Sequence, residues 1–177
     1  MSLLQPPAPD FSDPLGLLAA CHQRMLGFCG LLERLGPWLE SHPLDNDVRQ
    51  GIQRVIHYFG TAGEHHHRDE EQDLFPLLDS DEALAPLLAR LRAEHREQEH
   101  LWQALAGQLH PLLRGKCDLP ALDAAIAPFC AAYRRHIEQE ERHVLSAATA
   151  RLTVAQLQQL GRSMASRRGI APPSRTQ

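Results

Sequence analysis

The sequence predicts an all-α protein: an antiparallel up-down-up-down four-helix bundle with a short fifth helix at its C-terminal end. Apolar residues recur in steps of three and four along four segments of roughly thirty residues each. The connections between these segments are short, which favours antiparallel neighbours in a bundle. No segment combines the apolar/polar alternation of strands with the turn residues of hairpins.

The first two helices are predicted from their start signals and stop signals. Ser12-Asp13-Pro14 places a capping residue before a proline at the first helical position, where the missing N–H costs nothing. The first helix is expected to end at Gly36-Pro37 or to continue to about Glu40. The second is expected to run from near Asp45 to about Leu78. Their stripes are Leu15, Leu18, Met25, Cys29 and Leu32, and then Val48, Ile52, Val55, Phe59 and Ala62.

The remaining helices follow the same pattern. Ser80 and Asp81 are predicted to cap the third helix, Gly115 to end it, and Asp118 to start the fourth. The stripe of the third helix is Leu84, Leu88, Leu91, His95, Gln98, Trp102, Leu105 and Leu109; that of the fourth is Leu122, Ile126, Phe129, Tyr133, His136, Glu140, His143 and Ala147. The fifth helix is expected from about Thr153 to Ala165, with Val154, Leu157 and Leu160 on one side.

Length and charge limit the possible classes of protein. The chain has 177 residues, 43% of them hydrophobic, which fits one domain with a sizeable core. We expect a bundle domain over residues 11–168 and disordered tails over residues 1–10 and 169–177. The net charge is −4 and no basic stripe occurs, so neither nucleic acid nor an anionic membrane is indicated as a partner. The sequence indicates no particular protein partner.

The expected location is the cytoplasm. Residues 1–10 lack the basic and apolar regions of a secretion signal. No apolar stretch is expected to reach the length that spans a bilayer. The four cysteines form no C-x-x-C pair, which argues against a zinc knuckle or a thioredoxin-type motif and favours reduced thiols.

Ionisable residues interrupt the apolar stripes at one level of the predicted core. His22 lies four residues after Leu18 and therefore points inward with it. Unpaired charge in a core is very costly, so a group that compensates these residues is expected. The candidate metal ligands are His22, His66, Glu70, His95, His136 and Glu140.

An internal repeat strengthens the prediction of a metal site. Residues 66–71 and 136–141 both read H-x-x-x-E-E, and each is followed three residues later by an apolar pair. A single H-x-x-x-E on a helix is more often a solvated pair, but two copies in register on apolar stripes favour a metal site. Four imidazoles and two carboxylates suit two bridged irons better than zinc, which usually takes four ligands and often sulfur.

Two registers stay open within the repeat. His67 and Glu71 have the same i, i+4 spacing as His66 and Glu70, and Glu141 could replace Glu140. His66 is preferred because it continues the stripe of the second helix, whereas His67 faces about 100° away.

These motifs resemble those of the hemerythrin family, and specifically of bacterial hemerythrin-like domains with a His-His-Glu cation-binding motif. The resemblance covers about residues 13–150: Asp13-Pro14-Leu15 with His22, the segment 66–76, Glu94-His95, and the segment 136–141. It implies a four-helix bundle around an oxo- or hydroxo-bridged pair of non-haem iron ions. It also implies a centre that binds O2 or NO, senses redox state or supplies iron.

One position departs from the oxygen carriers of that family. They have a second histidine four residues after the histidine of the third helix, and Glu99 stands there in this chain. His100 is one residue away and points to a different face. The resulting set of four histidines and two glutamates resembles that of the iron-sulfur-repair relatives, which also carry an N-terminal cysteine-pair segment that is absent here.

The sequence thus predicts a diiron protein that binds O2, NO or a similar small ligand, or handles iron and redox stress, without turnover of an organic substrate. The alternative is a diiron oxidase or peroxidase of the ferritin-like kind, whose sites usually contain more carboxylates. A purely structural bundle is the third possibility. Asp73 and His143, each seven residues after a repeat histidine, are further candidates to pair with each other or to orient the metal ligands.

Overall fold

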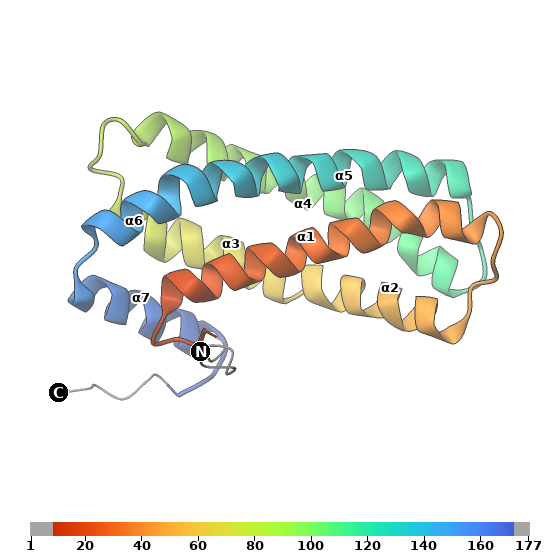
Figure 1. The fold of residues 1–177 in the computed structure, drawn as a ribbon, viewed down its shortest axis with the longest axis horizontal. Helices are drawn as coiled ribbons and strands as arrows, with labels where there is room; N and C mark the ends of the chain where they lie inside the picture. The colour runs from red at the N-terminus through yellow and green to blue at the C-terminus, as the bar shows by residue number, and fades with distance from the viewer. Residues whose placement is uncertain (1–8, 172–177) are drawn as a thin grey trace, which may run out of the picture.

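Four helical rods run side by side along the long axis of the molecule (Figure 1) in the computed structural model, which describes residues 9–171. No strand occurs among these residues, so the predicted all-α bundle is confirmed. The rods are α1 (Pro14–Leu39); α2 (Asn46–Phe59) with α3 (Ala62–Asp69), η1 (Glu70–Leu74) and η2 (Phe75–Leu77); α4 (Ala85–Leu113); and α5 (Leu119–Gln139) with η3 (Glu140–Leu145) and α6 (Ser146–Arg151). The fifth helix is α7 (Val154–Arg167). The predicted disordered tails lie largely outside the described residues.

The helix starts predicted from capping residues are mostly correct. The side chain of Asp13 accepts from the backbone N–H of the third residue along at 3.0 Å, and Asp45 and Asp118 do the same at 2.9 and 3.1 Å. Thr153 forms a reciprocal capping box with Gln156 at the start of α7. Each such cap stabilises its helix by about 0.5–2 kcal/mol.

Two predicted boundaries are wrong. The second rod is interrupted between α2 and α3, where the hydroxyl of Thr61 donates to the carbonyl of His57 at 2.6 Å and offers the backbone an alternative to the helix. The third rod begins at Ala85 rather than directly after Ser80 and Asp81, because the Asp81 carboxylate caps a local turn at Ala83 instead.

A π-helical turn shifts the register of the second rod after Glu70, and another shifts that of the fourth rod after Glu140. Both η1 and η3 start at the first glutamate of an H-x-x-x-E-E repeat. A π turn adds one residue to the helical repeat, so the next inward residues are Leu74 and Val144, 0% and 1% exposed, rather than Asp73 and His143.

The predicted pairing of Asp73 and His143 is therefore wrong. His143 is exposed. Asp73 accepts a hydrogen bond from Ser163 of α7 at 2.7 Å and contacts neither His143 nor a candidate ligand. Val154, predicted on the apolar side of the fifth helix, is exposed as well.

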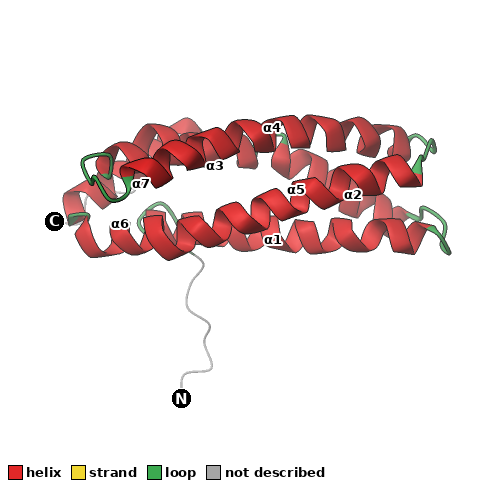
Figure 2. Cartoon of the chain, turned by 90° about the horizontal axis from the view of Figure 1, so that it is seen from above, coloured by secondary structure: helices red, strands yellow, loops and turns green. Residues whose placement is uncertain are grey.

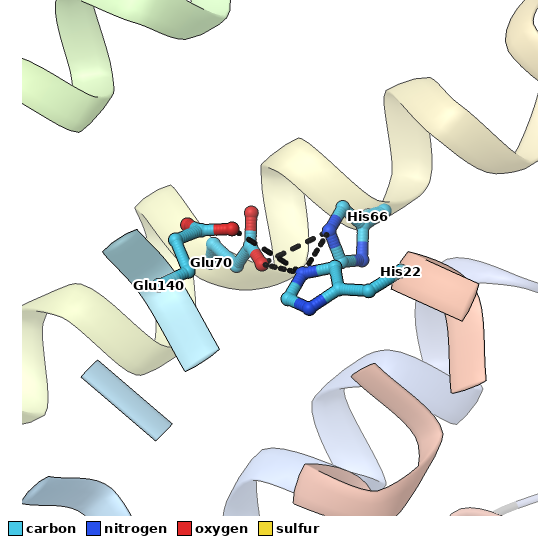
Figure 3. Close-up of side chains that lie close together, drawn as sticks. All are labelled: His22, His66, Glu70 and Glu140. Carbon is cyan, nitrogen blue, oxygen red and sulfur yellow. Dashed lines mark hydrogen bonds and ion pairs between the residues drawn. The ribbon is translucent and has the colours of Figure 1, made fainter. Parts of the chain in front are cut away.

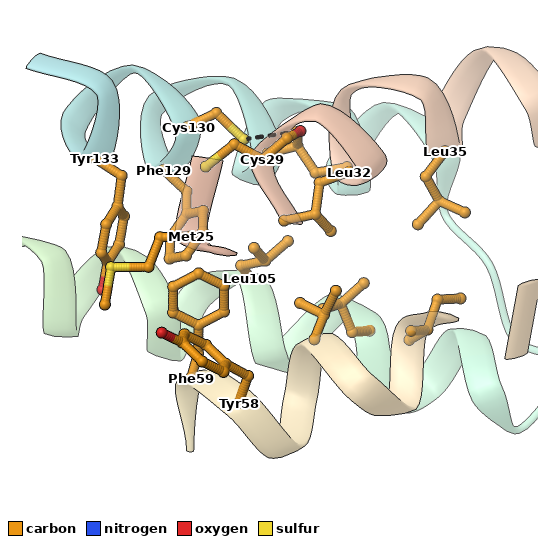
Figure 4. Packing of buried hydrophobic residues seen from close by; sticks show 14 of the residues in the cluster. Met25, Cys29, Leu32, Leu35, Tyr58, Phe59, Leu105, Phe129, Cys130 and Tyr133 are labelled. Carbon is orange, nitrogen blue, oxygen red and sulfur yellow. Dashed lines mark hydrogen bonds between the residues drawn. The ribbon is translucent and has the colours of Figure 1, made fainter. Parts of the chain in front are cut away.

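Two apolar clusters enclose the middle of the bundle. The larger contains the aromatic residues of α2 and α5, where the rings of Phe59 and Phe129 meet edge to face at 5.0 Å between centroids (Figure 4). Truncation of Phe129, which is fully buried, to alanine is expected to cost about 3–5 kcal/mol. The smaller cluster joins the ends of the rods to α7 and comprises Leu18, Leu74, Phe75, Leu78, Leu88, Leu91, Val144, Ala148, Leu160 and Met164. The polar level predicted from the sequence lies between these clusters.

By length and composition, α1 could cross a membrane. It has 26 residues with a mean hydropathy of 1.3 in its most apolar window. The expectation that no apolar stretch approaches that length is therefore wrong. In the fold, one face of α1 packs into the core, because Leu18, Met25 and Leu32 on that face are 0–1% exposed.

Candidate metal centre

The structure brings all six predicted candidate ligands together in the middle of the bundle. Each rod contributes: α1 one histidine, the second rod a histidine and a glutamate, α4 one histidine, and the fourth rod a histidine and a glutamate. All six are at most 4% exposed, in a region where ionisable side chains are rare unless paired or bound to metal. They are His22, His66, Glu70, His95, His136 and Glu140.

Their ligand atoms form two groups that share both carboxylates. In each group, one atom from every residue lies within 4.8 Å of the others. The first group is His22, His66, Glu70 and Glu140, whose side chains point toward one another in Figure 3. The second is Glu70, His95, His136 and Glu140.

The two carboxylates connect the two pairs of imidazoles. Glu70 Oε1 lies 3.0 Å from His66 Nε2, and its other oxygen lies 3.4 Å from His95 Nε2. Glu140 Oε2 lies 3.2 Å from the Nε2 atoms of both His22 and His136. Each glutamate thus reaches both pairs, which is the arrangement of bridging ligands.

The donor set fits metal cations. The Nε2 atoms of His22 and His66 face each other at 3.1 Å, and those of His95 and His136 at 3.0 Å. Both oxygens of Glu140 and Oε2 of Glu70 are buried without a hydrogen-bond partner among the described residues. Buried carboxylate oxygens that accept no hydrogen bond are costly, and cations held between these donors would compensate them.

Mutual attraction shifts the pKa values of the cluster. Burial alone lowers the pKa of His22, but the carboxylates of Glu140 and Glu70 outweigh it and raise the pKa to about 9. For His136 burial again lowers the pKa, and Glu140 raises it to about 9. Burial and the charge of Glu70 raise the pKa of Glu140, but His136 and His22 outweigh them and lower it to about 2. The metal-free cluster therefore holds protons on its imidazoles that cations have to displace.

The glutamates of the alternative register stand behind the imidazoles. Glu71 Oε1 lies 2.7 Å from His95 Nδ1, and Glu141 Oε1 lies 3.4 Å from His22 Nδ1. Glu94 Oε2 lies 2.9 Å from His136 Nδ1. Carboxylates in such positions fix the ring orientation and tautomer of ligating histidines. The structure therefore places His66, Glu70 and Glu140 in the cluster, and Glu71 and Glu141 around it.

Glu71 and Glu141 were predicted only as alternative ligands, and Glu94 was not predicted as a functional residue. Their signal in the sequence is the second glutamate of each repeat and the glutamate directly before His95. A residue next to an inward ligand faces away from the metal on its own helix, so only the packing of neighbouring helices shows which ring it reaches.

A cavity of about 420 Å³ reaches one side of the cluster. His67 stacks on His95 with ring centroids 4.1 Å apart, and both rings line the cavity. Glu99 also lines this cavity. Among the candidate ligands, the cavity therefore reaches the half of the cluster that contains His95.

Fold and cluster together define a helical-bundle protein with a buried site in which two shared carboxylates link two pairs of imidazoles. Residues 13–148 match the hemerythrin HHE cation binding domain, and the chain belongs to this family. It is also 30% identical over 184 residues to an uncharacterized protein of Haemophilus influenzae, an alignment that covers 96% of this chain and 99% of that protein. The family match ends before α7, whereas this alignment reaches into it.

Proposed function

We propose that the chain binds two non-haem iron ions and uses them to bind O2, NO or a similar small ligand, or to handle iron under redox stress. The observation that carries the proposal is the pair of four-residue donor groups that share Glu70 and Glu140. Each group offers two imidazole nitrogens and two carboxylate oxygens. Iron accepts such mixed nitrogen and oxygen donors and can keep further positions open.

The iron ions, when bound, would supply open coordination positions and one-electron redox chemistry. The residues of the chain would orient the ligands and limit the access of water. Glu71 and Glu94 orient the rings of His95 and His136, and the two apolar clusters keep bulk water away from the carboxylates. Gln98, one turn after His95, is 1% exposed, and its amide has no hydrogen-bond partner among the described residues. Its amide is therefore free to form a hydrogen bond with a small ligand that binds on this face of α4.

The donor set favours ligand binding over the alternative oxidase or peroxidase function. Ferritin-like enzymes surround their irons with more glutamates than histidines. This cluster contains four histidines and two glutamates. A cytoplasmic location belongs to the same proposal, and the four cysteines, all of which the structure describes, are free thiols.

The proposal is tested by metal analysis and visible spectra of protein purified without oxygen. We expect two irons per chain and, after exposure of the reduced protein to O2, the absorption bands of an oxo-bridged ferric pair. Zinc or no metal in the protein after incubation with Fe(II) would overturn the proposal. Steady consumption of peroxide or an organic substrate would favour the enzyme instead.

A further inference from the structure

A second buried carboxylate lies directly beside the cluster. Asp69 is the last residue of α3 and precedes Glu70, with which the π turn begins. Its side chain is 0% exposed, but it takes no part in the two donor groups. A fully buried charge requires partners, so the groups that pair with Asp69 help to fix the start of the π turn.

The partners of Asp69 are two consecutive arginines at the end of α7. Arg168 approaches Asp69 with both terminal nitrogens, Nη2 at 2.6 Å from Oδ2 and Nη1 at 3.2 Å from Oδ1. Arg167 pairs with Asp69 Oδ1 and also donates to Asp73 Oδ2 at 2.6 Å. Two-nitrogen contacts of this kind fix geometry as well as charge. The arginines thus connect α7 to residues on both sides of Glu70.

The rest of α7 packs closely against the bundle and so fixes the position of these arginines. Leu160 and Met164 are 0–1% exposed and belong to the smaller apolar cluster. Gly161 packs against the backbone of Phe11 so closely that a Cβ atom there would lie 2.0 Å from the Phe11 carbonyl oxygen. Figures 1 and 2 show α7 beside the end of the bundle that contains α3 and the start of α1.

This clamp lies outside the part of the chain that matches the family. The family match covers residues 13–148, whereas α7 spans Val154–Arg167. The family match therefore does not include α7, and the contact with Asp69 needs an explanation of its own.

We propose that Asp69 is a positioning residue and that α7 acts as an outer clamp on the metal centre. By holding Asp69, Arg167 and Arg168 fix the π turn that places Glu70 between the two pairs of imidazoles. The clamp slows metal release and sets the geometry of the shared carboxylate. This inference rests on the proposed metal function.

The test uses the full chain loaded without oxygen with Fe(II) and, separately, with Co(II) as a spectroscopic probe. Asp69→Asn removes the charge that the clamp holds. Because the arginines then lose this partner, a second variant that combines Asp69→Asn with Arg167→Met and Arg168→Met removes both members of each ion pair that Asp69 forms. The matched control is Arg162→Met, which alters an exposed pair with Gln159 on the same helix. Metal release to a chelator, the metal spectrum and the melting temperature are measured for each.

We expect both clamp variants to release metal about tenfold faster or more, the scale typical of groups that orient metal ligands, and to show an altered metal spectrum. Arg162→Met should match the unchanged chain. A lower melting temperature with unchanged release rate and spectrum would overturn the clamp, because α7 would then only stabilise the fold. A chain that binds Co(II) but no iron would refute the iron proposal while the clamp is still measured with Co(II), and a chain that binds neither ion would overturn both.

Discussion

The two halves of the candidate metal centre differ in what stands behind their imidazoles. In the His95/His136 half, both Nδ1 atoms contact a carboxylate within 2.9 Å, and a cavity reaches His95. In the His22/His66 half, both Nδ1 atoms are buried without a hydrogen-bond partner, with Glu141 3.4 Å from that of His22. Carboxylates orient the imidazoles of the first half, and a cavity reaches one of them, whereas the imidazoles of the second half are enclosed and do not line that cavity. We therefore expect small ligands to bind on the His95/His136 side.

The largest expected effect comes from substituting a glutamate that both halves share. Glu70→Gln should remove both irons, because Glu70 lies within reach of both pairs of imidazoles. His66→Ala or His136→Ala, each confined to one half, should leave one iron or none. Most helix content should persist in all three, because both apolar clusters stay intact. Iron analysis and circular dichroism measure this.

The controls for these variants are histidines on the surface. His42 and His110 are both exposed, and alanine at either position should leave the iron content unchanged. Equal iron loss from these two would show that the site has been misplaced.

The carboxylates behind the imidazoles should separate the halves. Glu71→Gln and Glu94→Gln are each expected to weaken metal binding by about 10–100-fold, because they weaken the contacts that orient His95 and His136. Glu141→Gln, whose contact with His22 is longer, should have a smaller effect. Competition with a chelator of known affinity measures all three, and an equal loss from all of them would contradict the difference between the halves.

The cavity provides a kinetic test of the His95/His136 half. Gln103 lines the cavity from an exposed position, so Gln103→Trp should cover the opening without disturbing the core. We expect slower binding of azide or NO to the iron-loaded protein, with unchanged iron content. The matched control is Gln50→Trp at a surface depression elsewhere. Unchanged binding in Gln103→Trp would mean that ligands use another route.

The two halves should respond to pH in nearly the same way, so pH is expected to separate them least. His22 and His136, one from each half, both have pKa values raised from 6.5 to about 9, so their contribution to stability is complete below pH 6.5 and lost as the pH rises through 9. The pKa of Glu140 is lowered from 4.5 to about 2, so its contribution is complete above pH 4.5 and lost as the pH falls through 2.

The metal-free protein should therefore melt at a lower temperature at pH 9 than at pH 6. Metal binding should strengthen over the same range, because cations displace the protons of the imidazoles. Melting curves of the metal-free and metal-loaded protein at both pH values measure this. A melting temperature of the metal-free protein that rises between pH 6 and pH 9 would contradict these pKa shifts.

The sequence predicted the cluster because most of the helical segments that lead to it are regular. His22, His95 and His136 each continue an apolar stripe within one regular helix, and His66 keeps the inward face across the break between α2 and α3. Below the cluster the prediction failed for Asp73, because no local residue pattern announced the π turn.

The contacts of Glu71 and Asp69 were missed for a different reason. Each partner comes from a helix distant in the sequence: His95 of α4 for Glu71, and the arginines of α7 for Asp69. Periodicity shows which face of a helix a residue occupies, but not which neighbouring helix covers that face.

Each of the paired π turns holds one residue more than a regular helix would need at that point. If one residue were deleted between Glu70 and Phe75, a regular helix could form there, and Leu74 would become the seventh residue after His66 and stay on the inward face. The smaller apolar cluster would keep its contacts, and the change would be confined to the backbone that carries Glu70. The fold should therefore tolerate a single-codon deletion after Glu70 or Glu140 better than the same deletion in a regular part of either rod.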